Sequence, residues 1–335
     1  MLPGSSEQTM SARLAKRLPG SAQLVGALRG VSRSIRVLWD GGRAPFALVR
    51  QRVDPKPPVA WNASWVAELS HPSADKRFFS TNSLAARCRY VFNYGWFTVN
   101  EECQNNWYYS KTDDVDYFLA HHAPDTDFVL FSGHTDSSIG RRYKRHLRRP
   151  ELTAWFGVNV TLEDPKLVPM PLGIANPHPR WPNGDAETLR KVQESGIEKR
   201  RLFHAAYTVR TNPRERKRCL RETGVELDPP MEFEDYLVKL ASSYFCISPK
   251  GRGIDCNRTW EALYMRAIPV VTRSALTDRH PDFPMIVVED WSEFRSIDFS
   301  PDLYERTWGD WRLEAISLEG YLRRVQRTIA DLSSR

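Results

Sequence analysis

Hydrophobic and polar positions along residues 244–272 predict a strand, a loop, a helix and a second strand. Tyr244–Ser248 is a short apolar run of strand composition, and Pro249–Arg258 is a loop that contains Gly, Asp and Arg. Thr259–Ala267 places apolar residues at helical spacing, and Ile268–Val271 is a second β-branched run. Four such parts in about thirty residues form a βαβ unit, so the segment predicts a parallel sheet.

The same patterns predict further strands and helices on both sides of this unit. The predicted strands cover residues 90–97, 127–132, 152–160, 167–174, 201–207 and 285–289. The predicted helices cover residues 24–39, 60–68, 112–121, 140–150, 186–195, 232–243 and 313–332, and another begins at Pro213. Three Pro and one Gly in residues 176–185 mark a boundary between two sets of elements. The pattern therefore predicts an α/β fold with two domains.

Composition agrees with two folded domains. The chain has 335 residues, of which 41% are apolar, enough for two α/β cores. The net charge of +7 is concentrated at the start: residues 1–50 carry eight Lys or Arg against two acids, which leaves +1 for the other 285 residues. A body so close to neutral argues against nucleic acid as a partner. The five Cys show neither zinc spacing nor a disulfide pattern.

We divide the chain into four parts on these grounds. Residues 1–42 are a basic leader without fixed structure, 43–178 a first α/β domain, 186–300 a second α/β domain, and 301–335 a carboxy-terminal helix. The sequence contains no run of 18 apolar residues, so it predicts no membrane span. The compartment is left open between the Golgi or secretory pathway and the cytoplasm.

The loop of the βαβ unit contains residue types that suit a phosphate group. Ligands of open α/β sheets bind at the carboxyl ends of the strands, and a helix N-terminus there attracts anions. Gly251 and Gly253 let the backbone approach a ligand closely. The cations in the loop and at the helix start are Lys250, Arg252 and Arg258.

A carboxylate follows these cations. Glu261 lies in the first turn of the predicted helix, where it can accept hydrogen bonds from ribose hydroxyls. The alternative is an ordinary surface loop, in which Asn257 or Thr259 caps the helix and Glu261 is a first-turn acid.

Residues 248–271, SPKGRGIDCNRTWEALYMRAIPVV, resemble the donor-binding segment of exostosin-like glycosyltransferases. Looser matches are FVLFSGHTD (128–136), AWFGVNV (154–160), KLVPMPLGIAN (166–176) and TNPRER (211–216). The resemblance implies a GT-B fold, in which two Rossmann-like domains face a cleft and the carboxy-terminal helix returns toward the first domain. It also implies an inverting hexosyl- or pentosyltransferase of glycan biosynthesis, which moves a sugar from a nucleotide sugar to an acceptor hydroxyl.

The resemblance further implies which residues bind the donor. They are Ser248, Lys250, Arg252, Gly253, Asp255, Arg258, Thr259 and Glu261, together with Arg210 and Asn212 from the loop after strand 201–207. Cations and a helix dipole would stabilise the leaving nucleoside diphosphate in place of a metal ion. We therefore expect no metal and no cofactor, with a UDP- or GDP-linked sugar as co-substrate. The alternative is a fucosyltransferase-like enzyme, which also transfers a sugar from a nucleotide sugar.

The loop after strand 127–132 is where the first domain would place an acceptor. Its titratable groups are Asp136 and His134. Inverting transfer needs a base that takes the proton of the acceptor hydroxyl, and Asp136 is the first candidate and His134 the second. The alternative is a turn Asp that bonds to its own backbone. A glycan, a protein or a lipid would each suit as acceptor.

Two other charged stretches permit more than one interpretation. Residues 140–150 carry six cations on a predicted amphipathic helix, which form a solvated face or contact a membrane surface or an acidic acceptor. Asp114 and Asp116 match the D-x-D pattern of metal-diphosphate sites, but they open a predicted helix, where acids complement the dipole.

Two function classes besides an enzyme remain open. A non-catalytic protein that binds a nucleotide sugar or a glycan is favoured if neither Asp136 nor His134 faces the cleft and no other carboxylate does. An adaptor that binds membranes or nucleic acids through residues 13–50 and 141–149 would lose binding as salt is added, and it makes no use of residues 244–272.

Overall fold

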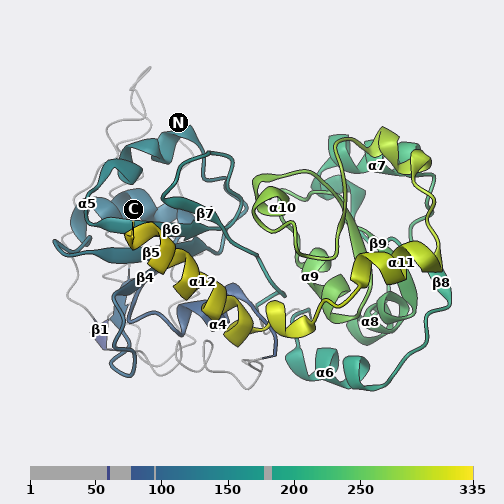
Figure 1. The fold of residues 1–335 in the computed structure, drawn as a ribbon, viewed down its shortest axis with the longest axis horizontal. Helices are drawn as coiled ribbons and strands as arrows, with labels where there is room; N and C mark the ends of the chain where they lie inside the picture. The colour runs from purple at the N-terminus through teal and green to yellow at the C-terminus, as the bar shows by residue number, and fades with distance from the viewer. Residues whose placement is uncertain (1–58, 61–76, 94–95, 177–182, 335) are drawn as a thin grey trace, which may run out of the picture. The chain divides into compact units, whose positions relative to one another are not determined.

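Two sheets with helices around them form a mixed α/β fold (Figure 1). This computed structural model describes residues 59–60, 77–93, 96–176 and 183–334, and residues 55–335 form one compact unit. The predicted leader over 1–42, the helix over 24–39 and residues 61–68 of the next predicted helix lie outside the described residues.

The first sheet has seven strands in the order β1-β3-β2-β4-β5-β6-β7. They are β1 (Val59–Ala60), β2 (Tyr90–Asn93), β3 (Trp96–Val99), β4 (Trp107–Lys111), β5 (Phe128–Gly133), β6 (Leu152–Gly157) and β7 (Leu167–Pro169). The strands β2, β4, β5, β6 and β7 run parallel to one another. The prediction of one strand over residues 90–97 is wrong, because β2 and β3 form an antiparallel pair there.

Strand β5 shows why the central strands are continuous apolar runs. Phe128 and Leu130 pack into a core cluster on one face of the sheet, and Val129 and Phe131 pack into another on the opposite face. Successive side chains of a strand point to opposite faces, so a strand that is covered on both faces is apolar at every position.

Different helices cover the two faces of this sheet. The cluster with Phe128 contains residues of α5 (Val115–His121) and of the 3₁₀ helix η3 (Arg141–Arg148). The cluster with Val129 contains residues of α4 (Thr81–Ala85) and of α12 (Leu318–Ser333), which Figure 1 shows in yellow. The end of the chain therefore contributes to the core of a sheet built from its first half.

Two helices differ in form from their prediction. Residues 140–150 form the 3₁₀ helix η3 and not an α-helix, although Tyr143 and Leu147 are buried as the pattern predicts. The helix predicted over 313–332 is divided into a short 3₁₀ helix, η6 (Leu313–Ala315), and α12, which Ser317 caps by accepting the N–H of Gly320 at 3.0 Å. Among the described helices, none has both the length and the apolar composition that crossing a bilayer requires.

The second sheet has four parallel strands in the order β11-β10-β9-β8. They are β8 (Arg201–His204), β9 (Ser243–Ile247), β10 (Ile268–Thr272) and β11 (Ile286–Val288). The βαβ unit predicted from residues 244–272 is confirmed, because α9 (Asn257–Tyr264) connects the parallel neighbours β9 and β10.

Helices around the second sheet share one core cluster with its strands. The remaining elements are α6 (Ala186–Glu194), η4 (Val209–Thr211), α7 (Pro213–Thr223), α8 (Phe233–Ala241), α10 (Ala275–Arg279), η5 (Trp291–Ser296) and α11 (Pro301–Trp308), with η2 (Thr112–Asp114) before α5 in the first half. Pro213 is the first residue of α7, as predicted, and Asn212 caps this helix.

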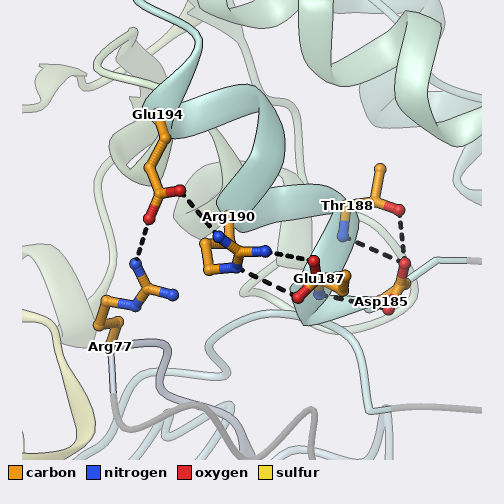
Figure 2. A network of polar contacts seen from close by, with 6 residues as sticks. All are labelled: Arg77, Asp185, Glu187, Thr188, Arg190 and Glu194. Carbon is orange, nitrogen blue, oxygen red and sulfur yellow. Dashed lines mark hydrogen bonds and ion pairs between the residues drawn. The ribbon is translucent and has the colours of Figure 1, made fainter.

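The start of α6 is fixed by a side-chain cap (Figure 2). The carboxylate of Asp185 accepts two backbone N–H groups of the first turn, at 3.3 and 3.1 Å. On the exposed face, Arg190 pairs with Glu187 and Glu194, and Glu194 also accepts a hydrogen bond from Arg77 at 2.7 Å. Exposed pairs of this kind contribute little to stability, so the cap is the stronger signal for the helix start.

A buried histidine between α10 and β7 predicts a loss of stability in mild acid. The ring of His280 stacks on Phe283 at 4.8 Å and lies 3.3 Å from the carbonyl oxygen of Pro169. Burial and the neighbouring Arg324 lower the pKa of His280 from 6.5 to about 4. The unfolded ring thus gains its proton first as the pH falls, and stability present above pH 6.5 is lost toward pH 4. The loss is on the order of 2–3 kcal/mol.

Urea denaturation between pH 7 and 4.5 tests this prediction. We expect the His280→Gln variant, which keeps a donor toward Pro169 but cannot titrate, to lose less stability over this range than the wild type. The exposed His121, changed to Gln, is the matched control and should follow the wild-type slope. Parallel slopes for all three proteins would rule out His280 as the source.

Candidate functional site

A cavity of about 1070 Å³ lies at the carboxyl ends of β8 and β9. The segments that follow these strands, including residues 206–208, 251–253 and 255–258, form much of its wall. Asp136 from the loop after β5 and Leu172 from the segment after β7 also line it. The loop predicted to bind a ligand therefore lines a cavity at the strand ends, where parallel sheets place their ligands.

Arg258, the second residue of α9, is buried in the cavity wall. Its side chain is only 9% exposed, and its Nε donates to the carbonyl oxygen of Ala206 at 3.1 Å. Its guanidinium carbon lies 5.1 Å from the ring centroid of Tyr207. Among the described residues, nothing accepts a hydrogen bond from its buried Nη1. A buried donor without an acceptor is costly, so an anion in the cavity that reaches this guanidinium would bind to it favourably.

A second buried arginine, Arg216 on α7, lines the same cavity. Its Nε and Nη1 donate to the carbonyl oxygens of Lys250 and Thr208, at 3.1 and 2.7 Å. Burial and the nearby Arg258 lower the pKa of Arg216. Two arginines so close together make this part of the cavity wall positively charged.

The sequence analysis missed Arg216, because residues 214–218 resemble a solvated basic helix. The signal that could have found it is the buried stripe of α7, which comprises Arg216, Cys219 and Thr223. A cation on such a stripe is held there by specific partners, and here they are backbone carbonyls and the Tyr207 ring, 5.5 Å from the guanidinium.

Glu261 lies one turn after Arg258 on α9 and also lines the cavity. Its Oε2 accepts a hydrogen bond from the hydroxyl of Tyr236 at 2.8 Å. Burial raises the pKa of Glu261, against the opposing effects of Tyr236 and Arg258. The cavity thus has a cation and a carboxylate within one turn of the same helix.

The carboxylate of Asp255 accepts hydrogen bonds from donors of the protein itself. Its carboxylate accepts the N–H groups of Leu172 and Cys256 and the indole N–H of Trp260, each at 2.8 Å. Burial raises the pKa of Asp255 to about 6 in spite of these three donors. These bonds indicate that Asp255 orders the loop, since the three donors take up both of its oxygens.

The other predicted donor residues fall into two groups. Arg252 is exposed and lines the cavity with Gly253, whereas Ser248 and Thr259 bond to one another through their hydroxyls at 2.9 Å. Neither Ser248 nor Thr259 lines the cavity. Three further residues do not line it either: Lys250, whose Nζ donates to the carbonyl of Arg273 at 3.1 Å, Asn212, whose Nδ2 donates to that of Gly251 at 2.8 Å, and Arg210, exposed on η4. Asn212 therefore holds the loop and caps α7, and Lys250 points to the end of β10.

The two predicted bases in the first half are placed differently. Asp136 is exposed and lines the cavity. His134 does not line it; its Nε2 lies 2.6 Å from the Oδ1 of Asn82, and its ring packs edge-on against Tyr109. Burial and then Lys111 lower the pKa of His134 to about 4. Of the two, only Asp136 has the access that a base for an acceptor needs.

Comparison with known protein families and with curated proteins gives no match to this chain. The cavity must therefore be interpreted from its own residues. The described residues contain no group of three or more His, Cys, Asp or Glu that could hold a metal ion. What the cavity offers is buried positive charge, a carboxylate on the same helix, and an aspartate from the opposite sheet.

Proposed function

We propose that this protein is a glycosyltransferase of the exostosin-like type with a GT-B arrangement, which uses a nucleotide-sugar donor. The observation that carries the proposal is the buried Nη1 of Arg258, which lacks an acceptor and belongs to a residue of the cavity wall. A diphosphate supplies oxygens for such a donor and charge for both arginines.

The residues of the wall have separate roles in the proposed reaction. Arg258 and Arg216 hold the diphosphate, the start of α9 adds its positive dipole end, and Glu261 accepts a ribose hydroxyl. The acceptor oxygen attacks the anomeric carbon, Asp136 takes the proton from that oxygen, and the bond to the nucleoside diphosphate breaks. The two arginines stabilise the negative charge on the leaving group, so we propose that transfer proceeds without a metal ion.

Nucleotide binding tests the proposal directly. We expect UDP or GDP to raise the melting temperature by about 5 °C or more when its concentration is a hundred times its Kd. Addition of Mg²⁺ or EDTA should leave this shift unchanged. If no nucleoside diphosphate or nucleotide sugar in a full panel stabilises the protein, the proposal fails. Nucleotide binding without sugar transfer or donor hydrolysis would favour the non-catalytic binding protein.

The Glu261→Ala variant tests the position of the ribose. We expect it to weaken nucleotide binding by about tenfold, the effect of one hydrogen bond to a charged group, without unfolding the protein. A nucleoside 2′,3′-dideoxy analogue of the same diphosphate should bind equally to variant and wild type. Unchanged affinity for the ordinary nucleotide would remove Glu261 from the site.

A further inference from the structure

One side chain, that of Asn159, links the loop that carries Asp136 to the loop that lines the proposed donor site. Asn159 follows β6, is 6% exposed, and has a φ of 58°, a left-handed conformation that is uncommon for residues other than glycine. Asn is among the few residues besides glycine that adopt this conformation readily, and the hydrogen bonds of its side chain fix it here.

Asn159 uses both ends of its amide. The Oδ1 accepts the N–H groups of Ile254 and Asp255, at 2.8 and 3.0 Å. The Nδ2 donates to the carbonyl oxygen of Thr135 at 3.2 Å. Ile254 and Asp255 belong to the loop after β9, and Thr135 directly precedes Asp136 in the loop after β5. One rigid amide therefore fixes the separation of two loops that belong to different sheets.

The chain makes room for this contact at Gly253. A Cβ on Gly253 would lie 2.7 Å from the Nδ2 and 2.9 Å from the Oδ1 of Asn159, closer than such atoms approach. Glycine is thus required there because the Asn159 side chain packs directly on the backbone of the loop. This gives a physical reason for the second glycine of the Gly-x-Gly pattern.

A second anchor holds the other side of the loop that carries Asp136. His134 contacts Asn82 through its ring, and the hydroxyls of Thr135 and Ser137 bond to Asp113. The pKa of Asp113 is lowered, because these hydrogen bonds and Lys111 outweigh the opposing effect of burial. The backbone around Asp136 is therefore held on both sides, while the Asp136 side chain is exposed at the cavity.

We infer that Asn159 is a positioning residue, which sets the distance between the base Asp136 and the donor held by the loop after β9. The structural part of this inference rests on the bonds alone, and its catalytic part rests on the proposed function. Because Arg258, Arg216 and Glu261 are positioned by their own helices, loss of the Asn159 amide should slow transfer while nucleotide binding persists.

Two substitutions separate the two ends of the amide. Asn159→Gly removes the side chain and tolerates the positive φ, so it loses both links without backbone strain. Asn159→Asp keeps acceptors for the N–H groups of Ile254 and Asp255 but loses the donor to Thr135. The matched control is Asn106→Gly, which removes an exposed amide that donates to the backbone of Asp127, before β5.

Amide hydrogen exchange and kinetics give independent readouts. In Asn159→Gly we expect the amides of Ile254 and Asp255 to exchange at least tenfold faster, whereas in Asn159→Asp they stay protected. In both variants nucleoside-diphosphate release from a nucleotide sugar should fall at least tenfold in kcat, with the Kd for the nucleoside diphosphate within about threefold of wild type. Asn106→Gly should match the wild type in all three measurements.

The outcomes distinguish this inference from the proposed function. Unchanged exchange at Ile254 and Asp255 in Asn159→Gly would overturn the link itself, whatever the protein's activity. Changed exchange with normal turnover would limit Asn159 to a structural role. If the wild type binds no nucleotide, the proposed function fails, while the link between the loops is still decided by exchange.

Discussion

The Arg258→Ala variant is expected to lose nucleotide binding by about 10- to 100-fold, because it removes a charge-assisted hydrogen bond from a buried site. The wild-type guanidinium is buried, donates one bond to Ala206, and has an Nη1 without an acceptor among the described residues. Its removal also takes a positive charge from beside the buried Glu261, which keeps the hydrogen bond from the Tyr236 hydroxyl. We therefore expect the ligand-free melting temperature to fall by a few degrees while the protein stays folded. Isothermal titration with UDP and GDP measures the first effect, and calorimetry the second.

A matched variant controls for loss of charge alone. Arg221→Ala removes an exposed arginine of α7 that pairs with Glu222, so it changes the net charge equally without touching the cavity. Its affinity for nucleotide should equal that of the wild type. Arg258→Lys keeps the charge but not the planar donor set, and an intermediate affinity is expected. If Arg258→Ala instead binds nucleotide normally and melts far below the wild type, Arg258 supports the fold and the proposed site is wrong.

The second sheet was predictable from the sequence because its signals are local. The apolar runs before and after residues 249–258 each form one strand, and the connecting helix begins within two residues of its prediction. Where prediction failed, the deciding contacts are distant in sequence. Arg141–Arg148 form a 3₁₀ helix that buries His146 with Tyr143 and Leu147, and the last two pack in the cluster that holds Phe128 and Leu130 of β5.

The location of the candidate site was predictable from the sequence, but the contacts that its side chains make were not. Cations and glycines after β9 indicate an anion-binding loop, and the structure places Arg258, Arg252 and Glu261 at the cavity. Sequence spacing could not show that the Lys250 side chain turns to the end of β10. Nor could it show that His134 packs against Asn82, since the two residues are 52 positions apart.

Asp255 also shows that the sequence cannot reveal hydrogen-bond partners that are distant along the chain. An aspartate in a predicted ligand loop is expected to contact the ligand. In the structure, however, its carboxylate already accepts hydrogen bonds from three N–H groups. One of them comes from Leu172, 83 positions earlier, so no local pattern could reveal the bond. Residues that hold the site and residues that bind the ligand look alike in sequence, and only their partners tell them apart.

The Asp255→Ala variant should be the most destabilising single change in this loop. It leaves the N–H groups of Leu172, Cys256 and Trp260 without their acceptor, and each unsatisfied buried donor costs about 1–3 kcal/mol. Water that enters from the cavity, and the removal of a carboxylate that is costly to bury in its ionised form, would offset part of this, so we expect a net loss of about 3 kcal/mol in the free energy of unfolding. Urea denaturation at pH 7 measures it, and Asp255→Asn, which keeps one acceptor oxygen, should lose less.

Asp136→Ala is the matched control for this prediction, because it removes an aspartate from the same cavity that is exposed. Its stability should stay within about 0.5 kcal/mol of the wild type. The two aspartates should then separate by function: Asp136→Ala abolishes transfer in a stable protein, whereas Asp255→Ala loses stability first and binds nucleotide to the extent that it is folded. Equal stability of the two variants would show that the three bonds to Asp255 contribute nothing, and that the loop is held by Asn159 and Asn257 instead.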